Sequence, residues 1–137
     1  MIKVAICDDD IQFIYKLEQS IFRFAEMKRI KVDVDGYTSG AEFIQKLQQS
    51  ERYDLLFLDI ELGDSSGIIV GNWIRSQIQY ESMQIVFVSA KEMYAMQLFD
   101  LRPMNFLVKP IQQERVDYIL DEYERLYQFQ PHIIEIG

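Results

Sequence analysis

The sequence has few of the residues on which thiol and imidazole chemistry depend. Its 137 residues include one cysteine, Cys7, and one histidine, His132. A single cysteine excludes an intrachain disulfide and any metal site built from cysteines alone. We expect Cys7 to be a small apolar residue at the end of a buried strand. One histidine near the C-terminus gives little support to histidine acid–base or triad chemistry.

Long apolar runs and basic blocks are also lacking. No stretch approaches the roughly 18 consecutive apolar residues that a membrane helix needs. The N-terminus has no signal-peptide pattern, so we expect a cytoplasmic protein with no membrane partner. The chain carries 14 Lys and Arg against 22 Asp and Glu, for a net charge of −8. The basic footprint of a nucleic-acid surface is therefore absent, and divalent cations or positively charged partners fit better.

Short apolar runs alternate with segments of helical period. The runs at residues 2–7, 55–58 and 85–88 are nearly continuous, as is typical of strands buried on both faces of a parallel sheet. Polar and apolar residues alternate between 31 and 36, which predicts an edge strand with one solvated face. The shorter run at 106–108 predicts a second edge strand.

The segments between these runs predict five helices. One apolar stripe extends from Phe13 to Phe24 and has Asp10 as its N-cap, and a last stripe extends from Val116 to Tyr127. Three shorter helices are expected near 39–48, 66–79 and 91–99. Alternating strands and helices indicate an α/β fold with right-handed crossovers and helices on both faces of a parallel sheet. Among known arrangements, the flavodoxin-like, doubly wound five-stranded sheet of order 2-1-3-4-5 places the second and fifth strands at the edges.

Ligands of such sheets bind beyond the carboxyl ends of the strands, so the residues that follow each run are the candidates for chemistry. They are Asp8 and Asp9 after the first run, Asp59 after the third, Ser89 after the fourth and Lys109 after the fifth. Carboxylates that share a pocket either hold protons or bind a cation, and an oxygen-only ligand set favours Mg²⁺.

A hydroxyl and an amine opposite these acids suit a phosphoryl group. Lys109 and Ser89 could stabilise its charge in transit, and Asp59 at the end of the central strand is the natural nucleophile for an aspartyl-phosphate. Each residue alone has an ordinary structural explanation: Ser89 as a helix cap, Lys109 in an exposed turn. Their joint placement favours the functional interpretation. We expect Asp10 to be a helix cap, and Asp54 and Asp64 to be solvated loop acids.

The pattern resembles the receiver domain of two-component response regulators over residues 1–128. The matching pieces are Asp8-Asp9, Asp59 after its apolar run, Gly67 eight residues later, Ser89-Ala90 and Lys109-Pro110. The resemblance implies a switch rather than an enzyme, with Asp59 phosphorylated by a sensor histidine kinase and at most slow self-dephosphorylation. It implies Mg²⁺ bound by Asp9, Asp59 and the backbone carbonyl of Glu61, with Asp8 acting largely through water.

The resemblance also implies roles for the residues around Asp59. Ser89 and Lys109 would hold the phosphoryl oxygens, and Phe106 would be the aromatic residue that rotates as Ser89 moves. Gly67 and Pro110 would be structural at the site, Pro110 through a peptide bond that is often cis. A homodimer through the last helix–strand–helix face is expected. Where the family often has proline, this chain has Gly63, which leaves the switching behaviour of that loop open.

Three segments resemble receivers that are joined to a LytTR-type DNA-binding domain: residues 6–10, 59–64 and 99–103. Such regulators have about one hundred further residues. Residues 129–137 resemble a linker or the opening of that second domain, so DNA binding and transcription regulation would occur only through a domain missing from this chain.

Two other functions stay open at this point. A haloacid-dehalogenase-like, Mg²⁺-dependent phosphatase also uses a strand-end aspartate, and Glu61 supplies an acid two residues after Asp59. That family normally has aspartate there and its metal-binding acids after the lysine, whereas this chain has Asp8 and Asp9 first. The other alternative is a receiver-like binding module that is never phosphorylated.

Overall fold

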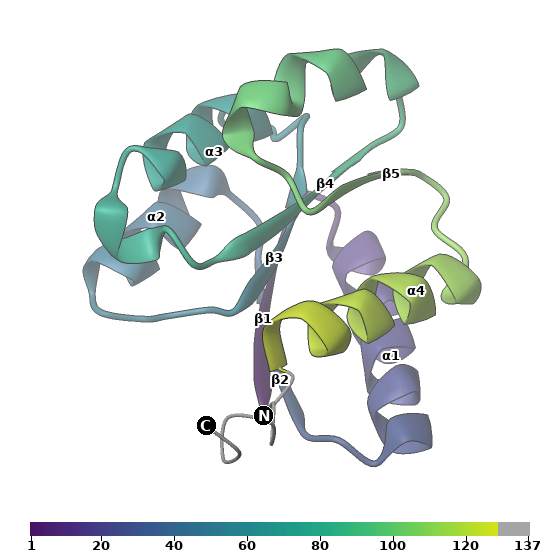
Figure 1. Ribbon diagram of the computed structural model, residues 1–137. Helices are drawn as coiled ribbons and strands as arrows, with labels where there is room; N and C mark the ends of the chain where they lie inside the picture. Colours follow the sequence, from purple (N-terminus) through teal and green to yellow (C-terminus); the bar gives the residue numbers. More distant parts are fainter. Residues whose placement is uncertain (129–137) are drawn as a thin grey trace.

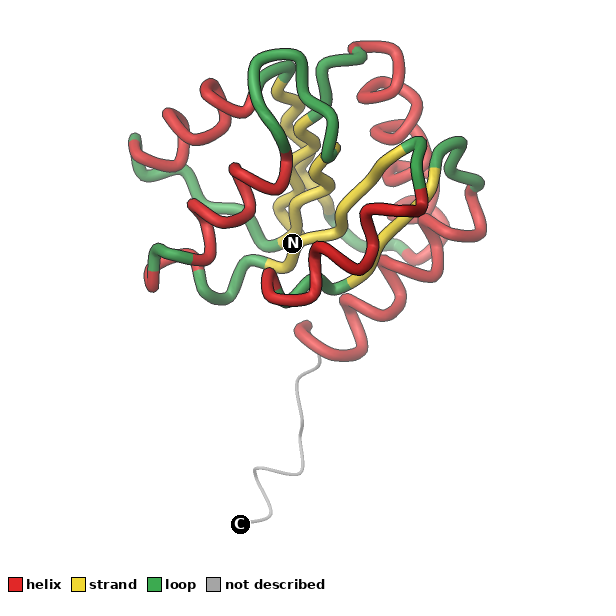
Figure 2. The backbone as a smooth tube through the Cα atoms, turned by 90° about the horizontal axis from the view of Figure 1, so that it is seen from above, coloured by secondary structure: helices red, strands yellow, loops and turns green. Residues whose placement is uncertain are grey.

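The four apolar runs and the alternating segment form the strands of one parallel sheet. The computed structural model describes residues 1–128, and within them the strand order is β2-β1-β3-β4-β5. This confirms the predicted flavodoxin-like order, with β2 and β5 at the edges. Seen from above, the strands lie between helices (Figure 2). The strands are β1 (Ile2–Cys7), β2 (Val32–Tyr37), β3 (Leu55–Asp59), β4 (Gln84–Ser89) and β5 (Asn105–Val108).

Helices cover both faces of the sheet. α1 (Ile11–Lys28) and α4 (Gln113–Tyr123) lie on one face, while α2 (Gly40–Gln48), α3 (Gly67–Arg75) and the 3₁₀ helix η2 (Glu92–Leu101) lie on the other (Figure 1). A 3₁₀ turn, η1 (Ile78–Tyr80), follows α3, and a π turn, η3 (Glu124–Gln128), follows α4. None of the helices within residues 1–128 is long and apolar enough to cross a membrane.

Three helix predictions differ from the structure in detail. The helix expected over 66–79 ends at Arg75, because Gln77 has an extended backbone and separates α3 from η1. The segment expected near 91–99 is a 3₁₀ helix rather than an α-helix. Tyr127, expected on the last apolar stripe, lies in the π turn with 47% of its surface exposed. The predicted linker at 129–137 lies outside the described residues.

The central strands divide their side chains between two cores. In β3, Leu55 and Phe57 contact the core under α1 and α4, whereas Leu56 and Leu58 contact the core under α2, α3 and η2. Because both faces are covered, the strand has no polar alternation before Asp59. Burying each such side chain contributes about 1.5–3 kcal/mol to folding.

Cys7 belongs to the same pattern. It is buried at the end of β1 in the core under α2, and burial raises the pKa of its thiol to about 12. The expectation of a small, apolar strand-end residue is confirmed.

Arg75 joins the end of α3 to the end of η2. Its guanidinium donates hydrogen bonds to the carbonyls of Leu101 (2.8 Å), Arg102 (3.3 Å) and Met83 (2.8 Å). The first two carbonyls belong to the C-terminal turn of η2, where a cation is favourable. Arg75 therefore fixes the C-terminal end of η2 to the body of the domain.

The turn from β3 into α3 depends on the absence of a side chain at Gly67. The Gly67 N–H donates to the carbonyl of Ile60 at 2.7 Å. A Cβ at Gly67 would lie 2.1 Å from the carbonyl oxygen of Asp59 and 2.9 Å from Ile60 Cα. These are backbone atoms of a strand end, so they have little room to shift.

We expect Gly67→Ala to lower the free energy of unfolding by about 3 kcal/mol, because the new methyl group overlaps the β3 backbone. Urea denaturation measures the loss. Gly63→Ala is the matched control, since a Cβ there would meet Asp9 Oδ2 at 3.3 Å, the far end of an exposed side chain. Equal stability of the two variants would contradict this account of the turn.

Candidate functional site

The register of the sheet brings the predicted strand-end residues to one edge. Cys7 pairs with Leu58, so Asp8 lies beside the end of β3 where Asp59 stands. Ser89 pairs with Val108, and the Lys109 N–H donates to the Ser89 carbonyl at 2.8 Å. The Lys109–Pro110 peptide bond is cis.

Three carboxylates converge at this edge. Ligand oxygens of Asp8, Asp9 and Asp59 all lie within 4.8 Å of one another. Asp8 and Asp59 are buried, with 1% and 5% of their surfaces exposed, and Asp9 is exposed. Asp10 is not part of the group: it is the N-cap of α1 and accepts hydrogen bonds from the N–H groups of Gln12 and Phe13, as predicted.

Lys109 supplies the opposing charge. Its ammonium lies 2.8 Å from Asp8 Oδ2 and 3.4 Å from Asp59 Oδ2. The same ammonium lies 4.2 Å from the centre of the Phe13 ring, a cation–π contact. Burial alone would lower the pKa of Lys109, but the two ion pairs outweigh it and the pKa is raised. Lys109 therefore stays protonated between the buried acids.

One lysine does not fully compensate two buried carboxylates. Burial is the main reason that the pKa of Asp59 rises to about 6, and the charge of Asp8 raises it further. The Glu61 N–H, which donates to Asp59 Oδ1 at 3.1 Å, and the Lys109 ammonium act in the opposite direction. A further positive charge at this edge would favour the ionised form of Asp59.

The donor set fits a hard divalent cation. Asp8 Oδ2 is buried and accepts no well-aligned hydrogen bond from the described residues, although Lys109 Nζ lies beside it as an ion-pair partner. Clustered carboxylate oxygens are ligands that Mg²⁺ takes in proteins, with water completing its shell. The side chain of Glu61 is turned to Lys91, whose ammonium lies 3.4 Å from Glu61 Oε2.

Ser89 and Phe106 belong to the same edge but are not joined to Asp59. Ser89 is fully buried, and its hydroxyl oxygen accepts a hydrogen bond from the Lys91 N–H at 3.0 Å. Phe106 pairs with Phe87 rather than with Ser89, and its half-buried ring packs against the core under η2.

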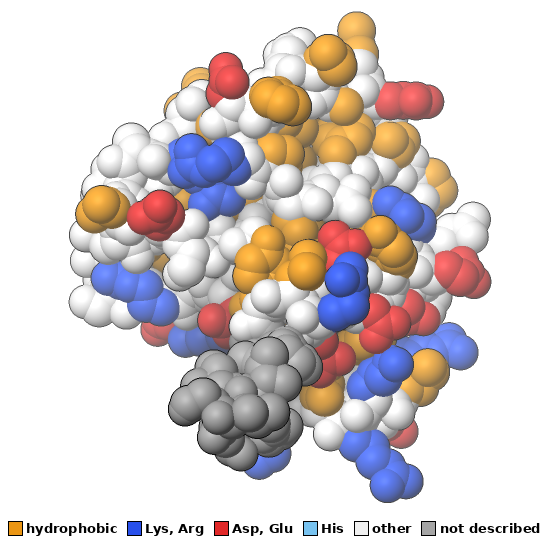
Figure 3. Space-filling view, viewed as in Figure 1, with side chains coloured by type: hydrophobic (Ala, Val, Ile, Leu, Met, Phe, Trp, Pro, Cys, Tyr) orange, Lys and Arg blue, Asp and Glu red, His pale blue; other side chains and the backbone are white. Residues whose placement is uncertain are grey.

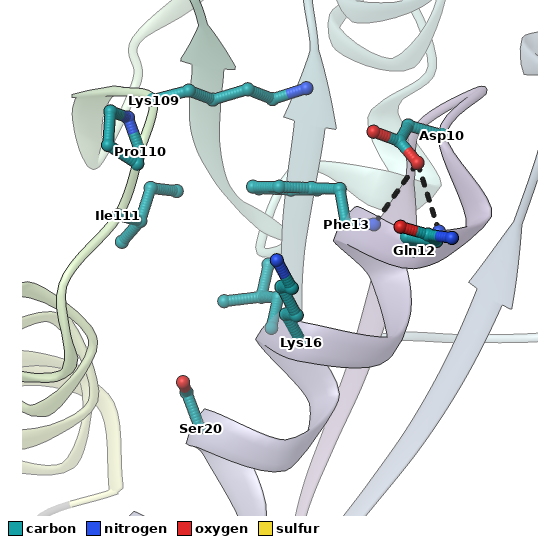
Figure 4. A pocket seen from close by; sticks show the side chains of 9 residues that line it. Asp10, Gln12, Phe13, Lys16, Ser20, Lys109, Pro110 and Ile111 are labelled. Atoms are coloured by element: carbon teal, nitrogen blue, oxygen red, sulfur yellow. Dashed lines mark hydrogen bonds between the residues drawn. The ribbon is translucent and has the colours of Figure 1, made fainter.

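Two side chains at the site were not expected from the sequence. Phe13 was predicted as part of the buried α1 stripe, but it is half-buried beneath Lys109 and lines a hollow of about 430 Å³ between α1 and Pro110 (Figure 4). Lys91 was not predicted because no strand-end or spacing rule singles it out. The contact of Phe13 with Lys109 and that of Lys91 with Glu61 arise only in the folded structure, because the partners are far apart in the sequence.

The two loop acids do more than face solvent. Asp64 is exposed, as predicted, yet it also accepts hydrogen bonds from the Gly40 and Ala41 N–H groups of α2 at 3.2 Å each. Asp54 accepts the Lys3 N–H at 2.8 Å and so joins the start of β1 to the start of β3.

Comparison with known proteins agrees with this geometry. Residues 4–121 match the family model for the response regulator receiver domain. The chain is 30% identical over 131 residues to the sensory transduction protein LytT of Bacillus cereus, which covers 95% of this chain and 50% of that protein. It is also 30% identical over 126 residues to the sensory transduction protein LytR of Streptococcus agalactiae. That match covers 92% of this chain and 49% of LytR. The chain thus spans about half the length of these relatives.

Solved structures share the fold. The response regulatory domain of mrkE from Klebsiella pneumoniae superposes with a TM-score of 0.79 at 23% identity, over 93% of this chain and 99% of that one. TrrA from Thermotoga maritima, solved in complex with Mg²⁺–BeF, gives a TM-score of 0.72 at 23% identity, over 89% and 98%. With the family model matched over most of its length, this chain belongs to the response regulator receiver domain family, and its curated relatives include transcriptional regulators of the LytT/LytR type.

Proposed function

We propose that this domain is a phosphorylation switch in which a partner sensor histidine kinase transfers a phosphoryl group to Asp59. The observation that carries the proposal is the placement of Asp59. It is a buried strand-end carboxylate beside Asp8 and Asp9, with the Lys109 ammonium 3.4 Å away. A carboxylate oxygen of Asp59 attacks phosphorus, the P–N bond to the kinase histidine breaks, and its electron pair stays on the imidazole.

Mg²⁺, held by Asp9, Asp59 and the Glu61 backbone carbonyl, with Asp8 acting through water, would neutralise charge on the phosphoryl group in transit. The chain's own residues would bind and orient the phosphoryl group. Lys109 already faces Asp59, so it needs little movement to pair with a phosphoryl oxygen. Slow hydrolysis of the aspartyl-phosphate, which resets the switch, is expected here.

Ser89 is the residue that would have to move. Its hydroxyl now accepts from the Lys91 N–H, and its own proton is free to be donated to a phosphoryl oxygen. We expect that donation to draw the start of η2 inward, with Phe106 turning into the vacated space. An added charge of about −2 on Asp59 supplies the attraction.

An apolar surface supports pairing with a second copy through η2, β5 and α4. Met96 and Phe99 on η2 have 87% and 83% of their surfaces exposed, and Tyr118 on α4 has 50%. Figure 3 shows apolar side chains gathered over η2 and β5. Contiguous patches of exposed apolar side chains mark protein interfaces more often than single exposed residues do.

The names and lengths of the relatives support a proposal for the output of the switch. Their names describe sensory transduction and transcriptional regulation, and they are about twice the length of this chain. We propose that residues 1–128 are the receiver domain of such a regulator and that 129–137 lead into a LytTR-type DNA-binding domain. DNA binding would belong to that domain, in the cytoplasm, and not to this chain with its net charge of −8.

Incubation with acetyl phosphate and Mg²⁺ should add one phosphoryl group, measured by intact mass spectrometry. Asp59→Asn should abolish the adduct, because the amide is not a nucleophile. Asp100→Asn, at an exposed residue outside the site, should leave it intact. An adduct that persists in Asp59→Asn would refute the assignment, and sustained turnover of phosphate esters would favour a phosphatase.

Asp59→Asn should also stabilise the protein in the absence of divalent cations. Because the pKa of Asp59 is raised from 3.8 to about 6, the folded protein holds more protons than the unfolded chain between these values. The contribution of this group to the free energy of unfolding therefore falls as pH rises from 3.8 to about 6. Above about pH 6 the destabilisation by the buried charge is complete. We expect the variant to be more stable by about 1–2 kcal/mol at pH 7.5.

The gain should shrink as pH falls and disappear near pH 3, below the ordinary pKa of 3.8, where Asp59 is largely protonated in both states. Urea denaturation in EDTA across this pH range measures it. A stability difference that does not change with pH would contradict the buried, repelled carboxylate.

Beryllofluoride with Mg²⁺ should shift the protein from monomer to dimer in sedimentation velocity, and Phe99→Asp should remain monomeric because a charge would be buried at the interface. Ile78→Asp is the matched control, since Ile78 is equally exposed (85%) but lies on η1. A dimer that survives Phe99→Asp would remove this interface and leave the phosphoacceptor role untouched.

A further inference from the structure

The loop between β3 and α3 is attached to α2 through its tip. Asp64 Oδ1 accepts the Gly40 N–H and Asp64 Oδ2 accepts the Ala41 N–H, each at 3.2 Å. Ser39, the N-cap of α2, accepts the next N–H, that of Glu42, at 3.1 Å. The first turn of α2 is therefore capped by two residues, one local and one from the loop that follows Asp59.

A second contact beside Asp64 holds the same tip. Leu62 is buried, and its Cδ1 lies 3.3 Å from the place where a Cβ on Gly40 would stand. Leu62 thus rests on the residue whose N–H binds Asp64. The absence of a side chain at Gly40 allows the loop to approach the helix this closely.

Gly63, between these two anchors, lies close to the acidic site. A Cβ on Gly63 would lie 3.3 Å from Asp9 Oδ2, which is closer than most Cβ contacts in proteins. The loop tip therefore passes directly over Asp9. Any loosening of Leu62 or Asp64 would move the backbone that faces this carboxylate.

The base of the loop is fixed independently. Glu61 and Ser66 form an antiparallel bridge, and the Glu61 N–H donates to Asp59 Oδ1. The Glu61 carbonyl lies between this fixed base and the anchored tip. Its direction is set by the path of residues 62–65, because both ends of that segment are held.

We propose that Asp64 is a positioning residue for the cation site: its two hydrogen bonds to α2 hold the β3–α3 loop so that the Glu61 carbonyl and Asp9 are placed to bind Mg²⁺ together. The inference rests on the proposed Mg²⁺ site. It assigns to Asp64 a role through the loop and no contact with the ion. The charge of Asp64 is compensated at the positive end of α2.

A simpler role for Asp64 is that of a helix cap and nothing more. Loss of a cap lowers stability wherever the cap is, and it has no reason to change cation affinity. Ser39 provides the comparison within the same helix turn. It caps α2 as Asp64 does, but it belongs to the segment before α2, and its recorded hydrogen bonds are with Cys7, Glu42 and Phe43 rather than with the β3–α3 loop.

The test measures Mg²⁺ binding by isothermal titration calorimetry on the full chain, for the wild type, Asp64→Ala, Asp64→Asn and Ser39→Ala, with thermal unfolding of each. We expect Asp64→Ala to weaken Mg²⁺ binding about tenfold, which is the lower end of the range for residues that orient metal ligands without binding the ion. Asp64→Asn retains one acceptor oxygen and should lose about threefold or less. Ser39→Ala should bind Mg²⁺ as the wild type does, although its midpoint falls by about 4 °C.

Two results would overturn the positioning role. Unchanged Mg²⁺ affinity in Asp64→Ala, with a fall in midpoint like that of Ser39→Ala, would make Asp64 a helix cap. Equal weakening of Mg²⁺ binding in Asp64→Asn and Asp64→Ala would mean that Asp64 acts only through its negative charge at a distance. Absence of Mg²⁺ binding by the wild type would instead reject the proposed cation site itself. If Asp64→Ala does not fold, Asp64→Ser, whose hydroxyl is too short to reach both N–H groups, replaces it.

Discussion

The ion pair of Lys109 with two buried carboxylates is the constraint around which the domain is organised. Asp8 and Asp59 are taken out of water at the end of a sheet, and the ammonium of Lys109 lies between them. Such a cluster is stable only if its partners are held in place, because a buried charge without a partner is costly. β1, β3 and β5 supply the three residues, so the site requires the whole sheet in its correct order.

This arrangement leaves the cluster with excess negative charge, and the proposed function depends on that excess. The single lysine offsets only part of it, and the pKa of Asp59 is raised first by burial and then by the charge of Asp8. A cation relieves the repulsion, and a phosphoryl group on Asp59 would place new negative charge where Lys109 already lies. The pKa of Asp59 is thus set by its burial and by its charged neighbours within the described residues.

The fold could be predicted because hydrophobic pattern and strand order agree. Continuous runs marked the buried strands, alternation marked β2, and the edges followed. The polar residues at the strand ends could be placed together for the same reason. What the pattern could not supply was contact between loops. Three side-chain contacts depend on the paths of the loops and could not be read from the pattern: Lys91 with Glu61, Phe13 with Lys109, and Asp64 with α2. The break of α3 at Gln77 was missed because apolar spacing continues through it.

The hydrogen bonds of Arg75 give η2 two unlike ends. Its last carbonyls are fastened to α3, whereas its first residues follow Ser89 by a short loop without a side-chain cap. If the N-terminal end of η2 moved toward Asp59, the helix would rotate about its C-terminal end, which Arg75 holds. Met93, near the N-terminal end, would then move farther than Phe99, near the C-terminal end, so the exposed face of η2 would change its angle to the sheet.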